Sequence, residues 1–221
     1  MKNVPLLLGT ILGSIALIFV IGFLFSRTPQ TSTTSVDRAI LENDLVNTRG
    51  ASASATASSS AKVTVVEFSD FQCPACRAVE PLIAQLNQEY ADRVTFGFRH
   101  FPLESIHQNA RAAAIAAEAA ARQNAFWPYH DILFEKQDEW SEVTDPSQLQ
   151  NLFIEFATTL TLDENTFRSD LNNSDTAAQI TSDTALATQL KVNSTPSFFV
   201  NGIPTASTKL RESIESALLV P

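Results

Sequence analysis

The chain has 221 residues, of which 44% are hydrophobic and 18% are charged, and its formal net charge at pH 7 is −9. This length and apolar content suffice for one domain with a sizeable hydrophobic core. The negative charge disfavours nucleic acid as a partner, because phosphates would repel an acidic surface.

The N-terminal end contains an uncharged apolar run. Residues 5–25 read PLLLGTILGSIALIFVIGFLF, which is long enough to cross a bilayer as a helix. No small-x-small cleavage site follows the run, so we expect residues 1–27 to be a cytoplasmic stub and an uncleaved anchor in membrane lipid. A cleaved signal peptide is the alternative. Both place the remaining chain outside the cytoplasm.

Residues 28–61 are expected to form a flexible linker. Their last part, at 50–61, reads GASASATASSSA and offers too little apolar surface to fold. The folded domain is therefore expected at 62–221.

A strand followed by a helix is predicted at the start of this domain. Residues 62–68 read KVTVVEF, a β-branched apolar run typical of a buried strand. From Pro74 onward the apolar period becomes helical, and Pro74 suits the first turn of a helix. Pro81 is expected to kink that helix. Its apolar face is predicted to contain Val79, Leu82, Ile83, Leu86 and Tyr90.

Cys73 and Cys76 are the only two cysteines in the chain. A disulfide between them closes a very short loop and would constrain the unfolded chain little, so the pair indicates chemistry rather than a structural cross-link. Cys73 lies at the strand–helix junction, where unpaired N–H groups and the helix dipole stabilise a thiolate. Cys76, one turn later, is expected to be more buried and less reactive. Half of a zinc site is the alternative, but no pair of histidines has the spacing of further ligands, so no metal is expected.

The remaining elements are predicted from period and turn signals. We expect a second strand, a capping box at 105–108 opening a helix to about Asn124, further helices, a hairpin at Asn201-Gly202 with a short edge strand at Pro204, and a final helix. The helices between the second strand and the hairpin would form an insertion at about 104–190. Their predicted ranges are 126–137, a helix opened by Asp145-Pro146, 163–171 and 174–190.

Taken together, these features resemble the DsbA type of thioredoxin-fold protein over about residues 62–220. Cys73-Pro-Ala-Cys76 is similar to the redox motif of that family, and Glu67 stands six residues earlier, where the family has a buried acid. Thr195-Pro196 resembles the cis-proline loop that faces the cysteines, and Pro81 the kink proline. FWPYHD and FRHFPL resemble stretches of membrane-anchored bacterial relatives. The implied fold class is α/β, a thioredoxin fold with an inserted helical domain, preceded by an N-terminal transmembrane helix.

The resemblance implies roles for five residues. Cys73 would be the nucleophile and Cys76 the resolving thiol. Glu67 would accept the proton of Cys76, the alternative being an outward-facing strand residue. Thr195 would offer its backbone to an extended substrate segment, and Pro196 would be cis. Ala75 departs from relatives that have histidine there, which leaves the strength of the oxidant open.

The sequence favours structural roles for the three histidines and for two aromatic residues. We expect His100, His107 and His130 to pack among aromatic or helical neighbours, and Phe126 and Trp127 to pack between helices.

The expected function is that of a membrane-tethered thiol–disulfide oxidoreductase acting outside the cytoplasm. It would donate disulfides to reduced exported proteins and be re-oxidised by a quinone-linked membrane oxidase of the DsbB or vitamin K epoxide reductase-like type, with no bound cofactor. The alternatives are an extracytoplasmic reductase or isomerase, and a non-catalytic peptide-binding or chaperone domain.

Overall fold

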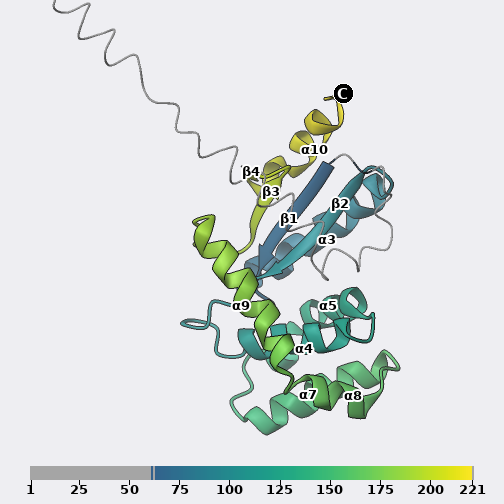
Figure 1. Cartoon of the computed structure of the whole chain (residues 1–221), viewed down its shortest axis with the longest axis vertical. Coiled ribbons are helices and arrows are strands. Elements are labelled where there is room, and N and C mark those ends of the chain that lie inside the picture. The colour runs from purple at the N-terminus through teal and green to yellow at the C-terminus, as the bar shows by residue number, and fades with distance from the viewer. Residues whose placement is uncertain (1–60, 62, 221) are drawn as a thin grey trace, which may run out of the picture. The chain divides into compact units, whose positions relative to one another are not determined.

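A computed structural model describes residues 61 and 63–220 of the chain (Figure 1). The predicted anchor and all but the last residue of the predicted linker lie outside the described residues. Within the described part, no helix is both long and apolar enough to cross a membrane.

A four-stranded mixed sheet organises the domain, in the order β2-β1-β3-β4. The central strand β1 (Val63–Ser69) pairs in parallel with β2 (Val94–His100) and antiparallel with β3 (Ser197–Val200). The short strand β4 (Ile203–Thr205) lies at the edge, as predicted from its proline. The predicted hairpin before it is confirmed.

Side chains of β1 are buried on both faces of the sheet, which explains why this strand reads as an almost continuous apolar run. Val63 and Val65 pack in one cluster with residues of α3 (Pro74–Tyr90) and α10 (Leu210–Leu218). Val66 and Phe68 pack on the other face with residues of α9 (Ser174–Gln189). Because side chains alternate along a strand, Glu67 shares the face of Val65, toward α3.

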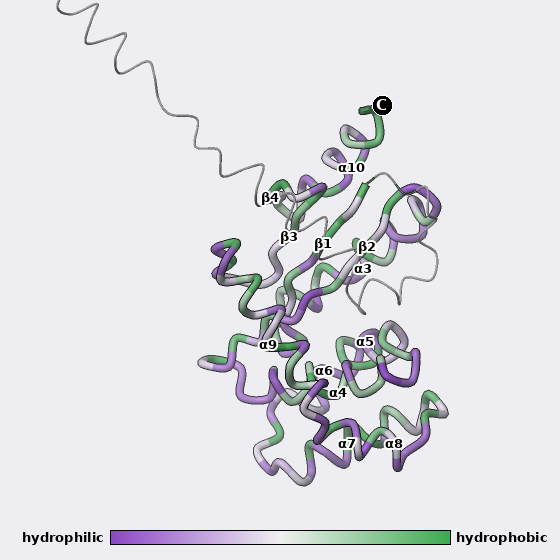
Figure 2. The backbone as a smooth tube through the Cα atoms, in the orientation of Figure 1, coloured by the Kyte–Doolittle hydropathy of each residue, from purple (hydrophilic) through white to green (hydrophobic). Residues whose placement is uncertain are grey.

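Six helices lie between β2 and β3 in the described chain. Most of them gather beyond the end of the sheet at which β1 ends, and α9 returns from them to β3 (Figure 1). Their tube carries both hydrophobic and hydrophilic residues (Figure 2), as expected for helices with one buried face. Their bounds, before α9, are α4 (Ala110–Ala121), α5 (Phe126–Glu135), α6 (Gln137–Trp140), α7 (Pro146–Thr159) and α8 (Glu164–Asp170); a 3₁₀ turn, η2 (Ser207–Lys209), precedes α10.

The helix predicted at Asp145-Pro146 is confirmed as α7. The Asp145 side chain accepts a hydrogen bond from the backbone N–H of Ser147, which caps the first turn. Phe153 and Phe156 on its apolar face are buried in the core of the helical part.

The capping box predicted at 105–108 is wrong. That segment forms turns, and α4 begins only at Ala110 and ends at Ala121, short of Asn124. Contacts with Asp70 accompany this difference: the Asp70 carboxylate binds the backbone N–H of Leu103, just before the segment, and the ring of His107 within it. At the far end Asn124 has a φ of 60°, which ends helical geometry. The run RVTFGFRHFPL at 93–103 predicts a longer second strand than the observed β2, which ends at His100.

A buried polar cluster ties β2 to the helical part. The guanidinium of Arg99 lies 2.8 Å from the Asp183 carboxylate of α9, and the backbone N–H of His100 donates to the same carboxylate at 3.0 Å. The His100 ring lies 2.9 Å from Glu118 of α4. Buried charged groups need such partners, so these contacts set how α4 and α9 meet the sheet.

Candidate active site

The cysteine pair occupies the first turn of α3. Cys73 is the N-cap residue and Pro74 the first residue of the helix, so the turn from β1 delivers the Cys73 sulfur to the helix N-terminus. Cys73 is 7% exposed and Cys76 is fully buried, which confirms the predicted difference in burial. Both cysteines are free thiols in this structure.

The two thiols have oppositely shifted pKa values. A hydrogen bond from the Cys76 thiol, helped by Thr195 and by the backbone N–H groups of Cys76 and Ala75, lowers the pKa of Cys73 to about 5. The pKa of Cys76 is raised well above its ordinary value, because its thiol donates a hydrogen bond to the Cys73 sulfur and because the group is buried. Near neutral pH, Cys73 is therefore the thiolate and Cys76 the thiol.

The loop before β3 faces Cys73 from the other end of the chain. The Thr195–Pro196 peptide bond is cis, as the resemblance implied. The carbonyl oxygen of Thr195 lies 3.7 Å from the Cys73 sulfur. The hydroxyl of Thr195 is also buried. This loop thus supplies polar atoms directly beside the nucleophile.

Glu67 lies beneath the motif on β1 and is 5% exposed. Burial raises the pKa of its carboxyl to about 7, with a further contribution from the nearby negative charge of Cys73. One of its oxygens has no hydrogen-bond partner in the described structure. The predicted alternative, an outward-facing residue, is therefore wrong, and a carboxyl that titrates near neutrality can take up and release a proton.

Glu80 is a second acid at the site that the sequence reasoning missed. Burial, together with the charges of Glu67 and Asp131, raises the pKa of its carboxyl to about 9. Its Oε2 lies 3.7 Å from the Nε2 of His130, a buried ring whose pKa is lowered by burial. Its position four residues after Cys76, on the same face of the helix, is the sequence pattern that could have predicted a second acid beside the motif.

His130 lies among the aromatic rings beneath the motif, as its predicted structural role requires. Its ring centroid is 5.6 Å from that of Phe71 and 5.0 Å from that of Phe98. Phe71 precedes Cys73 by two residues, so this aromatic cluster supports the motif from the side of the helical part.

Two buried amide side chains join the cysteine turn to the helical part. Gln137 of α6 donates to the carbonyl of Phe71 at 2.7 Å and to that of Cys73 at 3.2 Å. Gln72 donates to the carbonyl of Ser141, and its own side-chain oxygen accepts from the backbone N–H of Asn109. The helical part therefore holds the position of the nucleophile, a function that its sequence did not reveal.

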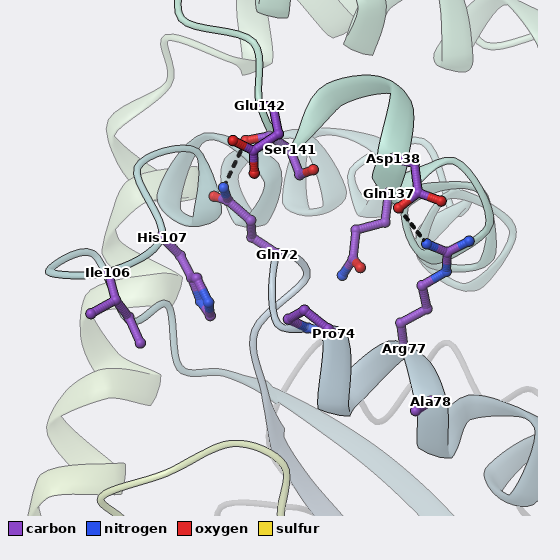
Figure 3. Close-up of a pocket in the computed structure, with 10 residues that line it drawn as sticks. All are labelled: Gln72, Pro74, Arg77, Ala78, Ile106, His107, Gln137, Asp138, Ser141 and Glu142. Atoms are coloured by element: carbon purple, nitrogen blue, oxygen red, sulfur yellow. Dashed lines mark hydrogen bonds and ion pairs between the residues drawn. The ribbon is translucent and has the colours of Figure 1, made fainter.

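A cavity of about 760 Å³ opens beside the motif, lined by Gln72 and Pro74, which flank Cys73, and by His107. Figure 3 shows His107 on one side of Pro74 and the ion pair of Arg77 with Asp138 on the other. The remaining lining residues are Ala78, Ile106, Gln137, Ser141 and Glu142. No group of three or more metal-ligating side chains occurs within the residues that the structure describes.

Comparison with known proteins places this geometry in a family. The family described as Thioredoxin matches residues 55–218. The chain is 33% identical over 151 residues to the probable disulfide bond formation protein D of Bacillus cereus, covering 64% of this chain and 67% of that protein. It is also 43% identical over 142 residues to the Na(+)/H(+) antiporter NhaA 3 of Salinispora tropica, covering 64% of this chain but only 20% of that much longer protein.

Solved structures agree with this family. BdbD from Bacillus subtilis has a TM-score of 0.63 and 27% identity, covering 73% of this chain and 90% of that chain. The thiol-disulfide exchange protein α-DsbA2 from Wolbachia pipientis, at 20% identity, has a TM-score of 0.64 and covers 83% of this chain and 95% of that chain, which shows the same fold. The chain therefore belongs to the DsbA-type thiol–disulfide oxidoreductases of the thioredoxin family.

Proposed function

We propose that the chain is a thiol–disulfide oxidase that passes the Cys73–Cys76 disulfide to reduced exported proteins. The observation that carries this direction is the pKa of Cys73, lowered to about 5. Whatever stabilises the dithiol form makes the corresponding disulfide a better oxidant, and a stabilised thiolate does so near neutral pH.

Each residue at the motif has a defined step in this reaction. A substrate thiolate attacks the Cys73 sulfur, the Cys73–Cys76 bond breaks, and a mixed disulfide forms while Cys76 takes up a proton. Glu67 exchanges protons with Cys76, and Thr195 holds the substrate backbone beside Pro196. A second substrate thiolate then releases Cys73 as the leaving thiolate, which its low pKa favours.

The direction is tested by mixing the oxidised full chain with a reduced, unfolded disulfide protein and, separately, the reduced chain with insulin. We expect oxidation of the thiols to be much faster than insulin reduction, and Cys73→Ser to abolish both. Insulin reduction as the faster reaction would assign a reductase or isomerase. Peptide binding that persists without any exchange would assign a chaperone-like role.

The location is part of the proposal. The apolar run at 5–25 would hold the domain at the outer face of the membrane, near a quinone-linked oxidase of the DsbB or vitamin K epoxide reductase-like type. In intact cells, added protease should then degrade the domain while cytoplasmic markers survive. Protection of the domain, or a mature N-terminus beyond residue 26, would contradict the anchored arrangement.

A further inference from the structure

His107 and Asp70 form a hydrogen-bonded pair beside the cysteine turn. The Nδ1 atom of His107 lies 2.7 Å from Oδ2 of Asp70. The Asp70 carboxylate is fully buried and also accepts backbone N–H groups from Gln72 and Leu103. Because a carboxylate can only accept hydrogen bonds, this contact assigns the proton of the hydrogen bond to Nδ1 and leaves Nε2 as the ring nitrogen that is not bound to Asp70.

His107 also lines the cavity beside Cys73. The His107 side chain is 16% exposed, whereas the Asp70 side chain bound to it is fully buried. Within the described residues, Nε2 has no hydrogen-bond partner. The cavity wall continues from His107 to Gln72 and Pro74, the two neighbours of Cys73 in the chain (Figure 3).

We propose that His107, oriented by Asp70, accepts the thiol proton of the substrate cysteine in this cavity. The inference rests on the proposed oxidase function and deepens it. Cys73 needs no such help, because its own thiolate is stabilised by the helix. An incoming cysteine has no helix N-terminus, so at neutral pH it arrives mostly as the unreactive thiol.

In the proposed step, proton transfer to His107 precedes thiol–disulfide exchange. The substrate S–H bond breaks and its proton moves to Nε2 of His107, which leaves a substrate thiolate and an imidazolium. The thiolate attacks the Cys73 sulfur, the Cys73–Cys76 bond breaks, and its electron pair leaves on Cys76. The substrate sulfur is oxidised and Cys76 is reduced, and the imidazolium later returns its proton to water.

The charges around the cavity suit a transient imidazolium. Asp70 is the anion in direct contact with His107, and Glu142 adds a carboxylate to the wall. The one cation of the wall, Arg77, is paired with Asp138 at 2.7 Å. Together with Cys73 and Glu67, these are the titratable and charged groups that bear on a pH profile.

The size of the effect follows from thiol ionisation. A cysteine with a pKa of about 8.5 is roughly 3% ionised at pH 7, so a base that ionises it fully can accelerate attack by at most about 30-fold. The advantage should vanish as the pH rises above the substrate pKa.

The test is single-turnover reduction of the oxidised full chain by a cysteine peptide and by the matching selenocysteine peptide, whose selenol is already ionised at neutral pH. His107→Asn keeps an amide N–H near the Nδ1 position for Asp70 but removes Nε2. We expect about 10- to 30-fold slower reaction with the cysteine peptide at pH 7, little loss at pH 9, and an unchanged rate with the selenol. Imidazole should restore the cysteine reaction of His107→Ala.

The controls separate this inference from the oxidase proposal. Glu104→Gln lies in the same turn but outside the cavity wall and should behave as wild type. Equal cysteine rates for wild type and His107→Asn, or equal slowing with both nucleophiles, would overturn the role of His107 and leave the oxidase function intact. A wild-type protein that reacts with neither peptide would overturn the oxidase function itself.

Discussion

Cys73 and Cys76 lie one helical turn apart, but their surroundings separate their protonation states. Cys73 receives hydrogen bonds at a helix N-terminus and its pKa falls to about 5, whereas Cys76 is buried and its thiol donates a hydrogen bond to the Cys73 sulfur. One thiol is thus the nucleophile and leaving group, and the other holds a proton, which is the asymmetry that stepwise disulfide exchange requires.

The buried carboxyl of Glu67 should make the stability of the reduced protein depend on pH. Its pKa, raised from 4.5 to about 7, means that the folded protein disfavours its ionised form, so its cost to stability appears above pH 4.5 and is complete above about pH 7. Glu67→Gln should therefore raise the free energy of unfolding of the reduced protein by about 1–3 kcal/mol at pH 8 and change it little at pH 4. Denaturant unfolding at both pH values measures this.

The same variant should react more slowly. Without the carboxyl, Cys76 loses its proton-exchange partner, so release of the mixed disulfide should slow near neutral pH while thermal unfolding stays cooperative. Glu104→Gln, an exposed carboxylate away from the motif, serves as the control. Unchanged turnover of Glu67→Gln between pH 5 and 8 would contradict the proton-exchange role.

At the scale of elements, the short helix α6 holds the cysteine turn through one buried side chain. Gln137 donates hydrogen bonds to two carbonyls of the turn, at Phe71 and Cys73, and the Cys73 carbonyl also accepts the first backbone hydrogen bond of α3, from Arg77. A buried carbonyl that loses its donor costs about 1–3 kcal/mol. The position of the nucleophile therefore depends on a residue of the helical part.

Gln137→Ala should lower the free energy of unfolding by about 1–3 kcal/mol and also slow thiol oxidation, because the turn before Cys73 loses its support. Gln148→Ala, an exposed glutamine of α7, is the matched control and should change neither. Unfolding curves and single-turnover oxidation of a reduced peptide provide the two measurements. A variant with lower stability but a wild-type rate would limit Gln137 to a structural role.

At the scale of the whole molecule, the thiolate of Cys73 links redox state to pH. A thiol pKa lowered from 9.0 to about 5 stabilises the folded reduced form fully above about pH 9. This stabilisation declines as pH falls and is lost below about pH 5. The oxidised form has no such thiolate, so acidification should remove the advantage of the reduced form.

The corresponding prediction concerns the two redox forms at several pH values. Near pH 7 the reduced form should be the more stable to denaturant, and the difference should shrink by up to about 1.4 kcal/mol for each pH unit between 7 and 5. Alkylation of Cys73 against pH gives its titration independently. An oxidised form that is more stable at pH 7, or a Cys73 that titrates like an unperturbed thiol, would reverse the proposed direction.

Local patterns in the sequence were sufficient for the frame of the site. The β-branched run before Cys73, the helical period after Pro74 and the Asn201-Gly202 turn predict β1, α3 and the terminal hairpin, because each depends on neighbours within one or two turns of chain. The positions of Cys73, Cys76 and Glu67 on that frame follow directly. The resemblance added the cis bond at Pro196, which local pattern alone would have assigned as trans.

What only the tertiary structure decided is which distant residues surround the motif. Glu80 and His130, Gln137 and Phe71, and the pair of His107 with Asp70 meet because helices from different parts of the chain pack together. The segment at 105–108 also makes a distant contact in place of the predicted capping box: the ring of His107 binds Asp70, more than 30 residues earlier, which also accepts the backbone N–H of Leu103. Sequence period reports burial along one element, whereas contacts between elements depend on packing and on buried polar groups finding partners.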